Sequence, residues 1–134
     1  MTPHEVFDRA IALLLDHDMV GFAGLWAVDG TMEFPFAAPG GVRRLDGRAA
    51  VANYLRDYTS LVDVRSVPES VVHTTGDPEV IIAEFAAEGV AVATGQPYRM
   101  PYVAVIRVRD GEIVSYRDYW NLAVAGDAFT GFAA

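Results

Sequence analysis

The second half of the chain alternates apolar and polar side chains with a period of two over most of its length. This period is typical of β-strands, in which successive side chains point to opposite faces of a sheet. Turn-forming stretches at residues 76–78, 89 and 110–111 divide the region. They predict strands at residues 61–74, 80–88, 90–108 and 113–121, the third of them kinked at residues 95–97. Such a meander needs a second layer to cover its apolar face.

The first half of the chain predicts a helical layer. Thr2, Pro3 and Glu5 form a helix start signal, with an N-cap, a proline at the first helical position and a capping box. Apolar residues then recur every three or four positions, as on one face of a helix. A polar break at residues 16–18 predicts a second, shorter helix, and a third is expected over residues 47–58. The second helix is expected to bury Met19, Phe22, Leu25 and Trp26.

Together these patterns predict a single α+β domain over residues 1–134. Three N-terminal helices are expected to pack in the concave face of a strongly curved, mostly antiparallel sheet. A short strand at residues 31–34 and a loop at residues 37–45 separate the second helix from the third. This arrangement leaves a cone whose open end is a pocket. Residues 123–134 are expected to form a tail or a lid.

The composition restricts the partners of such a domain. The net charge of −8 argues against nucleic acid and against an anionic membrane, because both require a basic surface. No cysteine is present, which excludes disulfides and thiolate chemistry. The polar start of the chain and the absence of a long apolar run favour a cytoplasmic location. The three histidines have no ligand spacing, so neither a metal nor another cofactor is expected.

Asp118 is the strongest candidate for a catalytic group. On a strand it shares one face with Tyr116 and Trp120. A carboxyl placed among aromatic rings and removed from water has a raised pKa, as acid/base catalysis near neutral pH requires. The alternative is an ion pair between Asp118 and a nearby arginine, such as Arg99 or Arg117. Glu84 offers a second carboxylate if its face of the strand points inward, although the register favours outward.

The preceding strand indicates which face lines the pocket. The even-numbered residues of this strand, among them Tyr98, Met100 and Tyr102, share one face. Their side chains are larger and more aromatic than those of the odd-numbered residues on the other face. Tyr54 and Tyr58, four residues apart on the third helix, are candidates to orient or protonate a ligand. The remaining predicted lining residues are Trp26, Phe34, Met100, Tyr102, Tyr116 and Trp120, with Phe36 as further wall. These side chains favour a small apolar or aromatic ligand. The opposite sheet face is also apolar and is expected to form a homodimer contact.

Three stretches of the chain resemble a known superfamily: residues 25–33 (LWAVDGTME), 45–51 (LDGRAAV) and 110–121 (DGEIVSYRDYWN). The order of predicted elements and these stretches resemble the nuclear transport factor 2-like superfamily, in particular its SnoaL-like, ketosteroid isomerase-like branch. The resemblance extends over nearly the whole chain and implies the cone fold. It implies less about function, because this superfamily contains isomerases, cyclases, epoxide hydrolases and binding proteins.

The catalytic positions of the relatives transfer only in part. The catalytic Asp of ketosteroid isomerases falls on Phe34, whereas the water-activating Asp of limonene-epoxide-hydrolase-like proteins matches Asp118. Phenazine-biosynthesis proteins of the A/B type have an acidic residue at that position and Asn at the position of Asn121. The resemblance implies a small cofactor-free acid/base enzyme of the isomerase, cyclase or hydratase type. The alternative is a non-catalytic module of the same fold that binds a ligand or dimerises.

Overall fold

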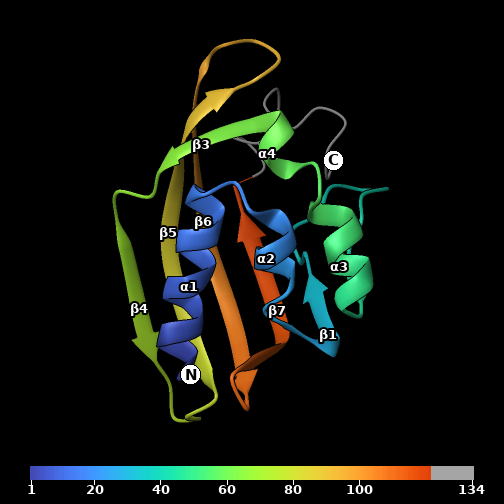
Figure 1. Cartoon of the computed structure of the whole chain (residues 1–134), viewed down its shortest axis with the longest axis vertical. Coiled ribbons are helices and arrows are strands. Elements are labelled where there is room, and N and C mark those ends of the chain that lie inside the picture. The colour runs from blue at the N-terminus through green and yellow to red at the C-terminus, as the bar shows by residue number, and fades with distance from the viewer. Residues whose placement is uncertain (122–134) are drawn as a thin grey trace.

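The computed structural model describes residues 1–121 as helices packed on a mostly antiparallel sheet (Figure 1). The helices are α1 (Pro3–Leu15), α2 (Met19–Ala23), α3 (Arg48–Leu55) and α4 (Tyr58–Leu61). The strands are β1 (Trp26–Glu33), β2 (Arg44–Asp46), β3 (Val62–Ser66), β4 (Ser70–Thr74), β5 (Val80–Ala91), β6 (Pro97–Arg109) and β7 (Glu112–Trp120). The predicted α+β class is confirmed. In the described part of the chain, no helix has the length and apolar character to cross a membrane.

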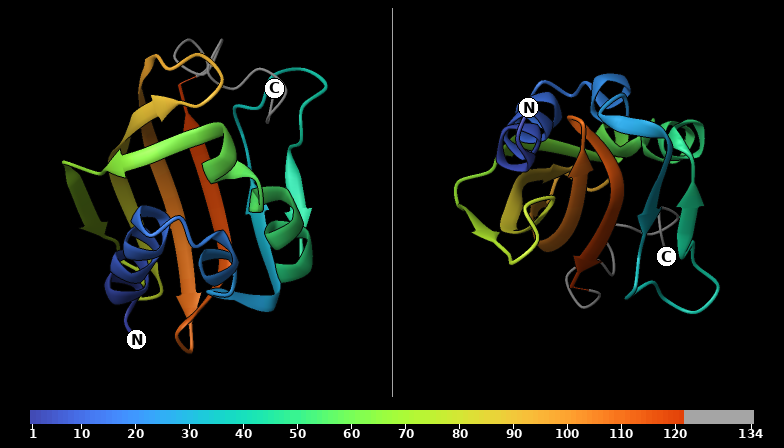
Figure 2. Two further views of the ribbon diagram at one scale, coloured as in Figure 1. Left: turned by 45° about the horizontal axis from the view of Figure 1, so that its top comes forward. Right: turned by 90° about the horizontal axis from the view of Figure 1, so that it is seen from below.

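The sheet has seven strands in the order β2-β1-β7-β6-β5-β3, with β4 also paired to β5. All pairs are antiparallel except β1 with β7, which the sequence pattern did not predict. Helices α1 and α2 lie on one face of this sheet, called here the inner face (Figure 1). Figure 2 shows the sheet bent so that β3 and α4 lie over the same face.

Helix α1 begins as the sequence predicts. The Thr2 hydroxyl accepts a hydrogen bond from the backbone of Glu5 at 3.1 Å, and the Glu5 carboxylate accepts one from the Thr2 backbone at 3.0 Å. This capping box satisfies two N–H groups that have no partner within the helix. The apolar stripe of the helix is buried against the sheet, where the Phe7 and Phe85 rings meet edge to face with centroids 5.5 Å apart.

Several predicted boundaries in the first half are wrong. Trp26 does not end the second helix but begins β1, where its indole N–H donates to the Thr31 carbonyl at 3.0 Å. Part of the expected loop at residues 37–45 is strand β2, which pairs with β1. The expected third helix is two helices, because α3 ends at Leu55 and α4 starts at Tyr58. The expected strand at residues 61–74 is interrupted around Pro68, which has no N–H for a sheet hydrogen bond.

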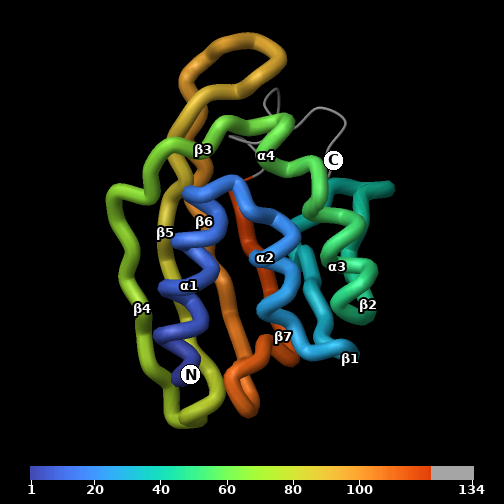
Figure 3. Tube along the Cα trace, in the orientation of Figure 1, coloured from blue at the N-terminus to red at the C-terminus, as the bar shows by residue number. Residues whose placement is uncertain are grey.

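Gly89 lies within β5 instead of at a turn. It pairs with Val64 of β3, and a Cβ atom at this position would lie only 1.8 Å from the Asp63 carbonyl oxygen. The glycine therefore permits a close approach of β3 to β5. The turn between β5 and β6 occurs at residues 92–96, where Gly95 has a φ of +70°. The expected kink is thus the tip of a long hairpin, which projects at the top of the trace in Figure 3.

Candidate active site

Asp118 lies on the inner face of the sheet, in a row of small side chains. Its register partner on β6 is Ala104, which in turn pairs with Ala83 on β5. Both alanines are fully buried, and Asp118 is only 9% exposed. It is the one charged residue that is buried among residues 1–121. The Asp118 side chain therefore lies on the helix side of the sheet, as the strand alternation in the sequence predicts.

The Asp118 carboxyl has no compensating charge within the described part of the molecule. Its Oδ1 atom is enclosed, and no described residue gives it a hydrogen bond. The two arginines considered as partners lie on the outer face, where Arg99 binds Glu88 at 3.1 Å and Arg117 donates to the Tyr119 hydroxyl at 3.2 Å. Burial alone raises the pKa of Asp118 from 3.8 to about 7.

Three tyrosine hydroxyls, two of them on buried side chains and that of Tyr102 on a partly buried one, meet within electrostatic reach of this carboxyl. Tyr58 of α4 lies 3.1 Å from Tyr98 and 2.9 Å from Tyr102, and the two β6 hydroxyls lie 3.2 Å apart. Burial is the largest cause that raises the pKa of each of these phenols, and the charge of Asp118 adds to it. The three side chains are therefore neutral hydrogen-bonding groups at physiological pH. They are called here the tyrosine trio.

Tyr54 approaches the site from α3, separately from the trio. Its ring packs on Phe34 with centroids 5.1 Å apart. Burial, followed by the charge of Asp118, raises the pKa of Tyr54 to about 12. Tyr54 and Tyr58 thus reach the neighbourhood of Asp118 from two different helices, and not from one helix as the sequence predicts.

Aromatic rings form two groups on either side of Asp118. Tyr116, two residues before it, packs against Trp26 with centroids 5.4 Å apart. Trp120, two residues after it, packs against Phe34 at 5.3 Å. The exposed fraction of Trp26 is 0%, that of Phe34 2%, and that of Met100 on β6 0%. The structure thus brings the predicted lining residues to the inner face; their contact with a ligand stays a prediction.

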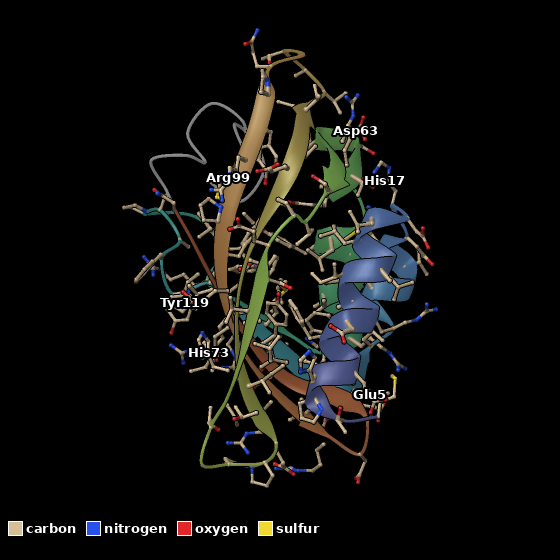
Figure 4. The ribbon with its side chains drawn as sticks, turned by 90° about the vertical axis from the view of Figure 1, so that its left-hand side faces the viewer. Glu5, His17, Asp63, His73, Arg99 and Tyr119 are labelled. Carbon is tan, nitrogen blue, oxygen red and sulfur yellow. The ribbon has the colours of Figure 1, made fainter. Side chains whose placement is uncertain are left out.

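Other sequence candidates lie on the outer face. The Glu84 carboxylate accepts a hydrogen bond from Nε2 of His73 at 2.6 Å, and both side chains are exposed. Figure 4 shows His73, Arg99 and Tyr119 on the side of the sheet away from α1. A two-carboxylate site of Glu84 with Asp118 is therefore ruled out by the register. Phe36 is also wrong as an inner wall, because it is 56% exposed and packs on Tyr119.

Tyr98 is the residue that sequence reasoning placed on the right face but did not select for the site. Its signal was the shared parity with Met100 and Tyr102 on one strand. Its hydrogen bond to Tyr58 joins residues 40 positions apart, which strand alternation does not predict. The proposed tail or lid at residues 123–134 lies outside the described residues.

Comparisons with known proteins agree on one family. The sequence model of the SnoaL-like domain matches residues 7–116. The chain is 39% identical over 127 residues to the uncharacterized protein YesE of Bacillus subtilis (strain 168), a match that covers 95% of this chain and 86% of YesE. It is 35% identical over 121 residues to the uncharacterized PhzA/B-like protein PA3332 of Pseudomonas aeruginosa, covering 90% of this chain and 85% of that protein.

A solved structure extends this agreement to the fold. The crystal structure of a Bacillus subtilis protein named "Putative Isomerase" superposes with a TM-score of 0.90 at 39% identity. The match covers 97% of this chain and 94% of that one. The family model and the two relatives each span most of the chain. The chain therefore belongs to the SnoaL-like domain family, in the nuclear transport factor 2-like superfamily with its ketosteroid isomerase-like fold.

Proposed function

We propose that this protein is a cofactor-free acid/base enzyme that isomerises, cyclises or hydrates a small, largely apolar molecule, with Asp118 as the proton-transfer group. The observation that carries the proposal is the buried Asp118 carboxyl, whose Oδ1 atom has no hydrogen-bond partner in residues 1–121. A pKa of about 7 lets this group exchange its proton near neutral pH. The name "Putative Isomerase" of the Bacillus subtilis neighbour is consistent with this class.

The chemistry assigned to the site is proton transfer at carbon. Ionised Asp118 removes a proton from a carbon next to a carbonyl group, and the electron pair moves onto the carbonyl oxygen. A hydroxyl of the tyrosine trio or of Tyr54 donates a hydrogen bond to that oxygen as its negative charge develops. In a substrate with a C=C bond conjugated to that enolate, the electron pair returns from the oxygen, the double bond shifts, and Asp118 gives the proton back to the far carbon of the original C=C bond. One well-placed proton-transfer group accelerates such a reaction by about 10²–10⁴-fold.

The aromatic side chains around Asp118 support an apolar substrate. The rings of Trp26, Phe34, Tyr116 and Trp120 supply extensive hydrophobic surface. They also keep water from the carboxyl, which is the cause of its raised pKa. A substrate with a planar or aromatic body would be matched by this surface.

The test uses an activated carbon acid as a general probe. Nitrobenzisoxazole is a small aromatic molecule; when a base removes its ring C–H proton, the N–O bond breaks and a coloured cyanonitrophenolate forms. Wild-type protein should accelerate this reaction, and the rate should rise with pH through about 7 as Asp118 ionises. Asp118→Asn should lower kcat/KM by about 10²–10⁴-fold.

The matched control is Glu84→Gln, which removes an exposed carboxylate from the outer face and should leave the rate unchanged. The proposal fails if Asp118→Asn turns the probe over as fast as the wild type. It also fails if the wild type is no faster than free acetate at the same concentration. The first result would reject Asp118 as the base, and the second would favour the alternative of a module that binds without catalysis.

A further inference from the structure

The charge balance around Asp118 bears on which ligands the site accepts. When ionised, this carboxyl is a buried negative charge without a cation among the described residues. A buried charge is costly unless it is paired or hydrogen-bonded. A neutral apolar ligand would leave that cost in place, and an anionic ligand would increase it. A ligand that brings a positive charge would remove it.

The rings beside Asp118 add a second, independent preference for a cation. Tyr116 with Trp26 lies on one side of the carboxyl, and Trp120 with Phe34 lies on the other. The face of an aromatic ring carries partial negative charge, so it attracts an ammonium group while it contacts the apolar substituents. A hydrated metal ion would gain little from such surroundings, whereas an alkylated ammonium ion uses both the charge and the rings.

The charge of the whole chain acts in the same direction. The net charge of −8 raises the local concentration of small cations around the protein. Arg117 of β7 and Arg99 of β6 are directed to partners on the outer face, and the other β6 arginines, Arg107 and Arg109, bind carboxylates near the end of the strand. They therefore do not compete with a cationic ligand for Asp118.

We propose that the site binds small organic ammonium ions, with the Asp118 carboxylate as counter-ion and the rings of Trp26, Phe34, Tyr116 and Trp120 around the alkyl groups. Such ions would compete with the neutral substrate. The inference rests on the same site as the proposed function, but it requires only binding and no turnover.

Binding should depend on pH through Asp118. The other titratable groups that interact with this carboxyl are phenols: Tyr54 on α3, Tyr58 on α4, Tyr98 and Tyr102 on β6, and Tyr116 on β7. Burial raises the pKa of each of them above its ordinary value, so all stay neutral below pH 10. Affinity for the ammonium ion should therefore rise with pH through about 7 and then level off.

The experiment compares two ligands of the same shape. Choline and neohexanol differ only in the central atom, which is a charged nitrogen in one and a neutral carbon in the other. Titration calorimetry of the wild type well above pH 7 should give a Kd for choline at least about tenfold lower than that for neohexanol. Asp118→Asn should reduce this difference to the part that the rings supply, whereas Glu84→Gln on the outer face should preserve it in full.

The outcomes separate this inference from the proposed function. Equal affinity for the two ligands, no binding of choline, or unchanged choline binding by Asp118→Asn would each overturn the ammonium site. If nitrobenzisoxazole turnover still depends on Asp118 in any of these cases, the proposed function stands alone. If choline binding depends on Asp118 but the probe is not turned over, the site is a receptor for ammonium ions and not an acid/base catalyst.

Discussion

A single buried carboxyl couples the stability of this chain to pH. Burial raises the pKa of Asp118 from 3.8 to about 7, whereas the unfolded chain exposes it to water. Between these values the folded protein holds a proton that the unfolded protein has lost. The free energy of unfolding therefore falls as the pH rises through this range. At about 1.4 kcal/mol per pKa unit, ionisation costs the folded state roughly 4 kcal/mol above pH 7.

Asp118→Asn should stabilise the protein above pH 7, although it is expected to abolish proton transfer. Asparagine has nearly the same shape and no charge, so the variant avoids the ionisation cost. Urea unfolding at a series of pH values should give nearly equal stabilities near pH 4. Once Asp118 of the wild type is ionised, the free energy of unfolding of the variant should exceed that of the wild type by up to roughly 4 kcal/mol. Glu84→Gln, an exposed control, should change stability by less than about 1 kcal/mol. If the free energies of unfolding of wild type and Asp118→Asn change with pH in the same way, Asp118 does not carry a buried charge in the folded protein.

At the level of elements, Gly89 determines how closely β3 approaches β5. A methyl group at this position would meet the Asp63 carbonyl oxygen at 1.8 Å and the Arg65 backbone nitrogen at 3.1 Å. Backbone atoms of a paired strand cannot move aside as the end of a side chain can. Gly89→Ala should therefore destabilise the fold by roughly 1–3 kcal/mol or more.

Gly76→Ala is the matched control for this prediction. The glycine has no atom within 4 Å of an added Cβ, so alanine should be tolerated there. Thermal unfolding of both variants measures the difference. If Gly89→Ala melts at the same temperature as Gly76→Ala, the close approach of the two strands is not a constraint on this fold.

The strand alternation placed Asp118 on one face with Tyr116 and Trp120, and the register favoured an outward Glu84, because the strand pairing around both carboxylates is regular. It was insufficient where an interaction joins distant parts of the chain. The parallel pairing of β1 with β7 and the hydrogen bond between Tyr58 and Tyr98 depend on tertiary contacts that no local period encodes. The glycine at position 89 illustrates the same limit, since a turn and a close strand contact both favour glycine.

At the scale of the whole molecule, the outer face of the sheet offers an apolar surface, although Tyr102 and Trp120 of the candidate site also contribute to its groove. It carries a groove of about 690 Å³, whose lining includes Phe36, Val71, Pro101, Val103 and Tyr119. Phe36 and Val71 are more than half exposed. Charges of both signs, from Arg99 and Glu84, also line this groove, so the face can pair with a copy of itself in which positive and negative groups meet.

We infer that two copies of this chain associate through the outer face, a contact that the sequence already led us to expect. Light scattering after size exclusion should give twice the 14.5 kDa of one chain. Val103→Glu places a second negative charge in the groove, beside Glu84 on β5. The two carboxylates would repel each other and would lose water against the apolar surface of the partner copy, so the variant should be monomeric. Val20→Glu makes the same change on α2, at a side chain that is 80% exposed, and should leave the mass unchanged.

A monomeric wild type, or a Val103→Glu variant that remains dimeric, would exclude the outer face as the interface. A monomeric Val103→Glu that still turns over the probe would show, in addition, that Asp118 works without the partner copy.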